Sequence, residues 1–347
     1  MLTLDTREQA GEPAHLAQDL ERALAAAEHS VSPCGGQNER ATAATHLSWR
    51  NVPRELLEPA TPAGLVRMAL AEWLMIAGLW CAIAATPWWL YPLLVIPLAG
   101  RFHALGVVLH DAAHMPLRRK TSAIRVVEVL CGYPIASTLN AMRYHHLRHH
   151  RDSGMETDPY YKAGRQNKAW HALNILRGLG LVPFWSVRAV VGAVASVAPA
   201  LRNVYAHVFL QDRTRGDLRD SPELIECARA EWGQMAAQGG VLALAVAFPG
   251  PMLSGYIVPV SIAGVLAARR LLNEHAYERV TDRRIETIIR TTHDNHLGLL
   301  GALVLAPRNI GYHIVHHIHP QVRLGVLPRL REWYMRAHPE IYPQARR

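Results

Sequence analysis

Residues 66–85 read VRMALAEWLMIAGLWCAIAA, a stretch of twenty residues whose only charges, Arg67 and Glu72, lie near its start. A helix of this length crosses a hydrocarbon core about 30 Å thick. After a two-residue link, WWLYPLLVIPLAGRFHALGVVLH at 88–110 is again long and apolar enough to cross. We therefore predict a tight antiparallel hairpin of two membrane spans, at about 66–85 and 88–109.

A second apolar block occupies residues 234–268. It is interrupted by FPGPMLSGY at 248–256, in which proline and glycine would break a helix. This pattern predicts a second hairpin of two short spans, at about 234–248 and 252–268. The fold class is therefore all-α and integral to a membrane, with four spans in two hairpins.

The remaining segments are less apolar or carry charges. The stretch at 181–201 contains Arg188, so we expect it to lie at the membrane interface rather than to cross. Residues 1–62 mix acidic and basic side chains and lack the apolar core of a signal peptide. We predict a soluble N-terminal arm over 1–62 and a single membrane domain over 63–347.

The charges orient this arrangement. The chain has 37 basic and 28 acidic residues, and the basic ones flank the inner ends of the spans, whereas both hairpin tips are uncharged. The positive-inside rule then places both termini and the long loop between the hairpins in the cytoplasm, in an inner or plasma membrane. The basic residues form no stripe with interleaved aromatics, which argues against a nucleic-acid partner. The four cysteines are far apart and predict neither disulfides nor a thiolate site.

Histidine is the unusual residue of this chain, with twenty copies. HDAAH at 110–114 places two imidazoles on one helix face at the inner end of the second span. RYHHLRHH at 143–150 and GYHIVHHIHPQ at 311–321 both contain the pattern HxxHH, and one more histidine follows the fourth span in NEHAY. The predicted metal ligands are His110, His114, His146, His149, His150, His275, His313, His316 and His317.

Neutral imidazole is a common ligand of borderline metals. Nine histidines exceed the number of ligands that one zinc ion binds, so the set predicts two metal ions rather than one. Without thiolates, iron is the most plausible occupant, although softness rules also admit zinc or copper. Each cluster taken alone could instead be a solvated basic segment, but four segments gathered at one membrane face favour a metal site. Ferrous iron with an open position suits dioxygen chemistry beside an apolar substrate.

The three motifs HDAAH, HHLRHH and GYHIVHHIHP, in this order and separated by apolar hairpins, resemble the histidine boxes of the membrane fatty acid desaturase superfamily over about residues 65–343. The resemblance implies a four-helix transmembrane bundle with a cytosolic helical cap that carries the boxes. It also implies two iron ions, O2 as co-substrate, and electrons from a separate ferredoxin or cytochrome b5 type donor. One departure is Leu271, where related acyl-CoA desaturases carry a ligating asparagine.

Other polar residues lie near the boxes. Asp111 and Asp158 are candidates to accept the second N–H of a ligating imidazole and so to fix its tautomer. Ordinary polar roles are favoured for four further residues, which are Glu274, His293, Asn295 and His296. We expect His145 and His319 not to bind metal, and His103 to be a core histidine.

These observations predict an O2-dependent di-iron oxidoreductase, a desaturase that introduces a C=C bond into a fatty acyl or other lipid chain. A lipid or alkyl hydroxylase, or a carotenoid ketolase of the same superfamily, is the close alternative. A membrane metal-binding or transport protein is a distant one, because the spans offer chiefly Arg101 and His103 as ionisable groups near the midplane.

Overall fold

The computed structural model describes residues 51–117, 119–164, 166–295 and 297–342, so most of the predicted N-terminal arm lies outside the described residues. Within these ranges the protein is helical, and its only β-type pairing is two isolated bridges. The all-α fold class is therefore confirmed. The main helices are α2 (Pro62–Ala85), α3 (Tyr91–Ala113), α4 (Ser122–Val127), α5 (Leu139–Asp152), α6 (Lys168–Leu176), α7 (Leu181–Val197), α9 (Pro222–Ala247), α10 (Pro249–Met252), α11 (Val258–Glu274), α12 (Ile285–Thr291), α13 (Leu299–Val304), α14 (His313–Ile318) and α15 (Leu327–Ala337).

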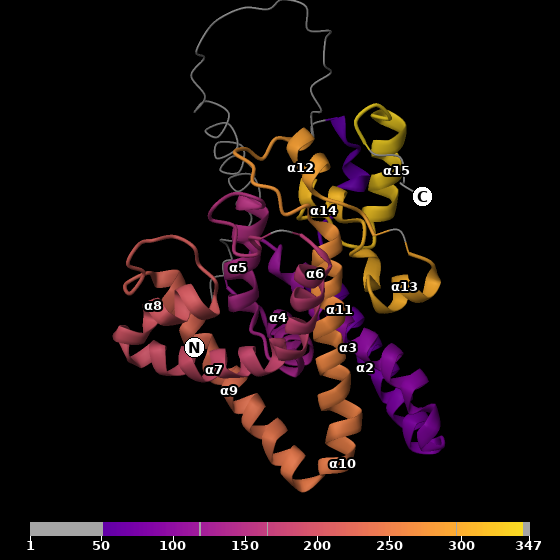
Figure 1. Ribbon diagram of the computed structural model, residues 1–347, viewed down its shortest axis with the longest axis vertical. Helices are drawn as coiled ribbons and strands as arrows, with labels where there is room; N and C mark the ends of the chain where they lie inside the picture. The colour runs from indigo at the N-terminus through magenta and orange to yellow at the C-terminus, as the bar shows by residue number, and fades with distance from the viewer. Residues whose placement is uncertain (1–50, 118, 165, 296, 343–347) are drawn as a thin grey trace, which may run out of the picture. The chain divides into compact units, whose positions relative to one another are not determined.

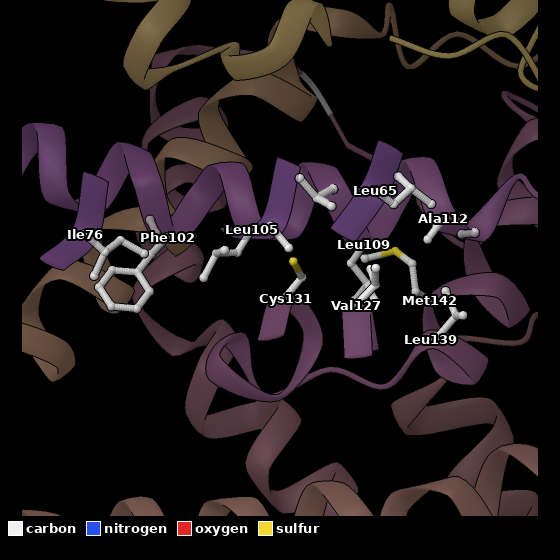
Figure 2. Packing of buried hydrophobic residues seen from close by; sticks show 14 of the residues in the cluster. Leu65, Ile76, Phe102, Leu105, Leu109, Ala112, Val127, Cys131, Leu139 and Met142 are labelled. Atoms are coloured by element: carbon white, nitrogen blue, oxygen red, sulfur yellow. The ribbon is translucent and has the colours of Figure 1, made fainter. Parts of the chain in front are cut away.

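The first hairpin forms as expected. Thr61 caps α2 by accepting a hydrogen bond from the Gly64 amide, and Pro62 occupies the first turn, where no amide donor is needed. Figure 2 shows Leu65 and Ile76 of α2 in a row with side chains of α3. This row also contacts α4 and α5, so the hairpin and the helix that carries the second histidine box share one apolar core.

Among the described residues, four helices are long and apolar enough to cross a membrane: Pro62–Ala85, Trp88–Ala113, Lys168–Val197 and Pro249–Glu274. The number agrees with the prediction, and three of these helices contain the stretches expected to cross at 66–85, 88–109 and 252–268. The fourth, Lys168–Val197, meets the requirement by length and composition and includes most of the stretch expected at the interface. The expected span at 234–248 is the apolar end of α9, a helix whose first half carries charges.

Figure 1 shows how these helices run. Helix α7 runs across the direction of α11, whereas α9 descends to meet α10 at the tip of the second hairpin. The chain turns at Phe248, and the prolines at 249 and 251 fall in the first turn of the returning helix, where they leave no amide donor unpaired. Helices α12, α14 and α15 lie at the opposite end of α11 from this tip.

The cap includes a segment that precedes the first span. Val52 and Leu56 are buried in one apolar cluster with Leu327 and Leu330 of α15. Pro59 pairs with Val322 in a β-bridge. The described end of the predicted N-terminal arm therefore packs on the C-terminal part of the chain.

A buried ion network joins both helices of the first hairpin to the cap. Glu72 of α2 is fully buried and accepts hydrogen bonds from Arg101 Nη1 (3.1 Å) and Arg308 Nε (2.6 Å). Arg101 lies in α3 and also donates to the carbonyl of Leu303 in α13. A carboxylate buried in an apolar span requires such partners, and its two arginines come from two segments far from each other and from α2 in sequence.

We expect Glu72→Gln to lower the free energy of unfolding by roughly 3 kcal/mol, because it leaves the buried guanidinium of Arg101 and the partly buried one of Arg308 without their counter-charge. The measurement is thermal or denaturant unfolding of purified protein in detergent. The control is Arg67→Gln, an exposed charge on the same helix, which should change little. Equal stability of the two variants would show that the network does not hold the hairpin to the cap.

Candidate metal centre

The structure brings all nine predicted histidines together from four segments. His110 lies in the last turn of α3 and His114 directly follows that helix. The second box lies on α5, the third forms α14, and His275 follows the end of α11. Their rings form an unbroken set of contacts, with centroids of neighbouring rings 4.1–6.4 Å apart.

Five of these histidines form one cluster, which we call the five-histidine cluster. Each has a ring nitrogen within 4.8 Å of a nitrogen of every other member. The Nε2 atom of His146 lies 2.9 Å from that of His114 and 3.0 Å from that of His150. Its members are His110, His114, His146, His150 and His316.

The other four histidines form a second set, the four-histidine cluster. Ring nitrogens of His149, His275 and His317 lie within 4.8 Å of one another. His313 joins them because its Nε2 atom lies 3.1 Å from the Nε2 atoms of both His275 and His317. The two clusters adjoin, since the rings of His150 and His317 stack at 4.2 Å.

The two HxxHH motifs divide between the clusters in opposite ways. On α5, His146 and His150 share the five-histidine cluster, whereas His149 belongs to the other. On α14, His313 and His317 share the four-histidine cluster, whereas His316 belongs to the five-histidine one. In both motifs the two histidines at positions i and i+4 lie in the same cluster, and the third histidine lies in the other cluster. Each motif therefore contributes to both clusters.

Seven of the nine imidazoles are buried, and His114 and His150 are partly buried. An imidazole must be neutral at the nitrogen that binds a metal. Burial lowers the pKa of His146, His150 and His316 well below the usual value, and a neighbouring imidazole lowers each further. Both ring nitrogens of His110 and of His316 are buried without a hydrogen-bond partner among the described residues. A buried polar nitrogen without a hydrogen-bond partner destabilises the folded state. A cation at the centre of the five rings would accept their nitrogen lone pairs and remove this cost. The residues present therefore fit a metal.

A carboxylate orients one of these rings. The Nδ1–H group of His149 donates to Asp158 Oδ1 (2.9 Å), which turns the lone pair of Nε2 toward the four-histidine cluster. Asp158 is itself held by the amides of Gly154 and Tyr160. Burial alone would raise the pKa of Asp158, but His149 and these donors hold it below the usual value. Asp158 thus occupies the position that the sequence predicted for an outer-shell group.

Asp111 is placed differently. It is buried beside His110, yet its Oδ2 atom has no hydrogen-bond partner in the described part of the chain, and it makes no hydrogen bond to a clustered imidazole there. His317 also lacks a carboxylate partner like that of His149, because its Nδ1 atom faces the guanidinium of Arg283 at 3.3 Å. A guanidinium can only donate, so the ring proton of His317 lies on Nε2 in this arrangement, and binding a metal there requires Arg283 to turn away.

Two residues at the site were not predicted there, since an ordinary polar role was favoured for Glu274 and Tyr160 was not considered. Glu274 is fully buried, accepts from Arg270 and Asn295, and has a carboxylate oxygen 3.5 Å from His313 Nε2. Tyr160 stacks on the ring of His149 at 4.4 Å. The position of Glu274 next to His275 was a usable signal, whereas no local pattern marks Tyr160.

The remaining histidines near the boxes have other partners. His145 Nδ1 lies 2.7 Å from the Tyr160 hydroxyl, and His319 Nε2 lies 2.7 Å from that of Tyr334. His103 donates to the carbonyl of Val304 (3.2 Å). His293 takes part in interactions within the fold, and His296 lies outside the described residues. None of the described members of this group belongs to either cluster.

A cavity of about 230 Å³ opens beside both clusters. His110 and His146 of the five-histidine cluster line it, as do His149, His275 and His313 of the other. Most of the rest of its wall is apolar and comes from α3, α7 and α11. The imidazoles therefore face an apolar chamber, which suits reaction at a hydrocarbon group.

We expect Asp158→Asn to lower the affinity for ferrous iron about 10–100-fold, because it replaces the charged acceptor that fixes the tautomer of His149 with a neutral amide, whose NH2 group can face the ring instead. The measurement is an anaerobic titration of purified protein. Asp152→Asn is the matched control, since that buried carboxylate in the same region bonds to Arg151 and Thr157 rather than to an imidazole. Unchanged affinity in the Asp158 variant would remove that carboxylate from the site.

Comparison with known proteins agrees with this geometry. A family model described as fatty acid desaturase matches residues 86–346, about three quarters of the chain. The chain is also similar to dihydrorhizobitoxine desaturase of Bradyrhizobium elkanii, with 32% identity over 118 residues, which is 33% of this chain and 33% of that protein. The matched segment thus spans about a third of the length of this curated relative. The chain is an integral membrane protein with a histidine site fit for metal, and it belongs to the fatty acid desaturase family.

Proposed function

We propose that this desaturase-like oxidoreductase is an O2-dependent di-iron enzyme that introduces a C=C bond into a lipid-like chain. The observation that carries the proposal is the pair of adjoining clusters of buried imidazoles that line one apolar cavity. The overall reaction converts a –CH2–CH2– unit, O2, two electrons and two protons into –CH=CH– and two waters. The electrons come from a separate donor of the ferredoxin or cytochrome b5 type.

In this proposal each cluster holds one iron. The five-histidine cluster would supply five nitrogen ligands and the four-histidine cluster four, and the Glu274 carboxylate lies 3.5 Å from His313 of the smaller one. When bound, the two irons would supply the reduction of O2 that removal of hydrogen from an unactivated carbon requires. The assignment to iron rests on an all-nitrogen donor set without thiolate.

The chain itself positions the substrate and keeps water away. Phe102 and Val107 of α3 and Val260 of α11 face the cavity, so a hydrocarbon segment is held by apolar contact next to the imidazoles. Asp158 and the backbone around it fix the ring of His149. The Tyr160 ring covers that imidazole on the cavity side.

Desaturation is preferred to hydroxylation because the curated relative is named a desaturase. We also propose that the histidine clusters lie on the cytoplasmic side of an inner or plasma membrane, where a soluble donor can reach them. The excess of basic residues favours an acidic donor.

The chain should bind two irons, and His316→Ala and His149→Ala should each lose metal from a different cluster. The measurement is iron content per chain after anaerobic purification. His319→Gln is the control, because that ring comes from the same box but bonds to Tyr334, and it should keep both irons. Full iron content in both alanine variants would refute the ligand assignment.

Expression with a donor in a host of defined lipid content should give an oxygen-dependent product that lacks two hydrogens. Mass spectrometry of extracted lipids distinguishes this outcome from the gain of one oxygen, which would identify a hydroxylase. His149→Ala serves as the inactive control. If the lipids of the wild-type and control strains are identical, an oxidoreductase acting on the lipids of that host is excluded.

A further inference from the structure

The segment between α12 and the third histidine box is apolar without being buried. Residues 297–306 read LGLLGALVLA and contain no polar side chain. Helix α13 lies in their middle, and Leu299, Leu300 and Leu303 of this helix are 80%, 71% and 48% exposed. Large apolar side chains gathered in this way on one exposed helix face indicate a contact with something other than water.

The contacts of α13 place it beside the middle of a membrane-spanning helix. Arg101 of α3 donates to the carbonyl of Leu303. His103 Nδ1 lies 3.2 Å from the carbonyl oxygen of Val304. Gly100 lies at the same point, since a Cβ atom on it would meet the Cα atom of Val304 at 3.0 Å. These three residues of α3 lie near the midpoint of its span.

The length of α3 converts this contact into a depth. Trp88 and Trp89 are exposed at the tip of the first hairpin, and exposed aromatic side chains of this kind mark a membrane interface. Arg101 follows Trp88 by thirteen residues, which is roughly 20 Å along a helix. A hydrocarbon core about 30 Å thick therefore extends about 10 Å past the end of α13 toward the cap.

Polar partners at the end of α13 agree with this depth. The last carbonyl groups of a helix have no partner within the helix, and hydrocarbon supplies none. Arg101 and His103 bond to two of these carbonyls. The chain then returns through the short helix η10 (Pro307–Asn309), where Arg308 Nε lies 2.6 Å from Glu72 Oε1. Ionisable side chains inside the membrane region therefore satisfy the backbone and the charge of this segment.

We propose that residues 297–306 form a re-entrant segment, which enters the membrane from the side of the histidine clusters and returns, with Leu299, Leu300 and Leu303 in contact with lipid acyl chains. Lipid is favoured over a second copy of this chain, because acyl chains fill the space around α3 at this depth. The third histidine box begins soon after the segment, at His313. Insertion would therefore hold that box at a fixed distance from the membrane.

Collision rates of a nitroxide spin label test this proposal on the full chain in phosphatidylcholine nanodiscs. The label is attached to Leu300→Cys after Cys34 and the exposed Cys81 have been replaced by serine, since Cys131 and Cys227 are buried. Power-saturation electron paramagnetic resonance measures collisions with oxygen, which enters hydrocarbon, and with a polar nickel chelate, which stays in water. We expect nickel collisions about tenfold or more below those of a label in water, because hydrocarbon excludes polar solutes. Oxygen collisions should equal those of a label in a membrane span.

Leu74→Cys and Arg290→Cys are the matched controls. Leu74 is 75% exposed on α2 and should report lipid, whereas Arg290 is exposed on α12 in the cap and should report water. Thermal unfolding equal to that of the unlabelled protein shows that a label leaves the fold intact, and Leu299→Cys takes the place of a Leu300 variant that does not fold.

A nickel collision rate at Leu300 equal to that at Arg290 would overturn the proposal. Low collision rates with both reagents would overturn it as well, because they would show that protein, such as a second copy of this chain, covers the helix.

Discussion

Nine imidazoles in one connected set of ring contacts, seven of them buried, are the constraint on which the rest of this structure depends. A ring that is removed from water loses its charge and keeps two polar nitrogens that need partners. Within the described residues several of these nitrogens have none. The free-energy cost of burying such groups must be offset by another interaction, and bound cations would coordinate many of the lone pairs at once.

The surrounding structure holds these rings in place. Thr138 caps α5 by accepting from the amide of Ala141, and the carboxylate of Asp294 accepts from the amide of Ile314 at the start of α14. The β-bridge between His275 and Thr292 fixes the residue that follows α11. Because three of the four ligand segments are fixed by such polar contacts, much of the arrangement can form before a metal binds, which lowers the entropy cost of binding it.

Much of this site follows from local sequence. Spacing of i, i+4 indicated that His110 and His114 share a helix face, and the expectation that all boxes lie at one membrane face predicted that the nine histidines would lie together, as they do in the structure. Sequence could not assign them to clusters, because the division of His149 from His146 and His150 depends on how α5 faces α14. Tyr160 escaped for the same reason, since its contact with His149 follows from the path of a loop.

The fold shows a similar boundary between local and tertiary information. Hydropathy predicted the first hairpin, whose helices are uniformly apolar apart from one buried ion network. Length and composition also select the stretch at 168–197, and the direction of α7 across α11 follows only from the tertiary arrangement. The turn at Phe248 was predictable from proline chemistry, whereas the pairing of Glu72 with Arg308 was not, since 236 residues separate them.

The occupancy and identity of the metal sites are tested most directly by anomalous X-ray diffraction at the iron edge from crystals grown without oxygen. Two peaks are predicted, one among His110, His114, His146, His150 and His316, and the other among His149, His275, His313 and His317. A single peak, peaks away from these rings, or no iron signal in protein that retains its fold would contradict a di-iron centre.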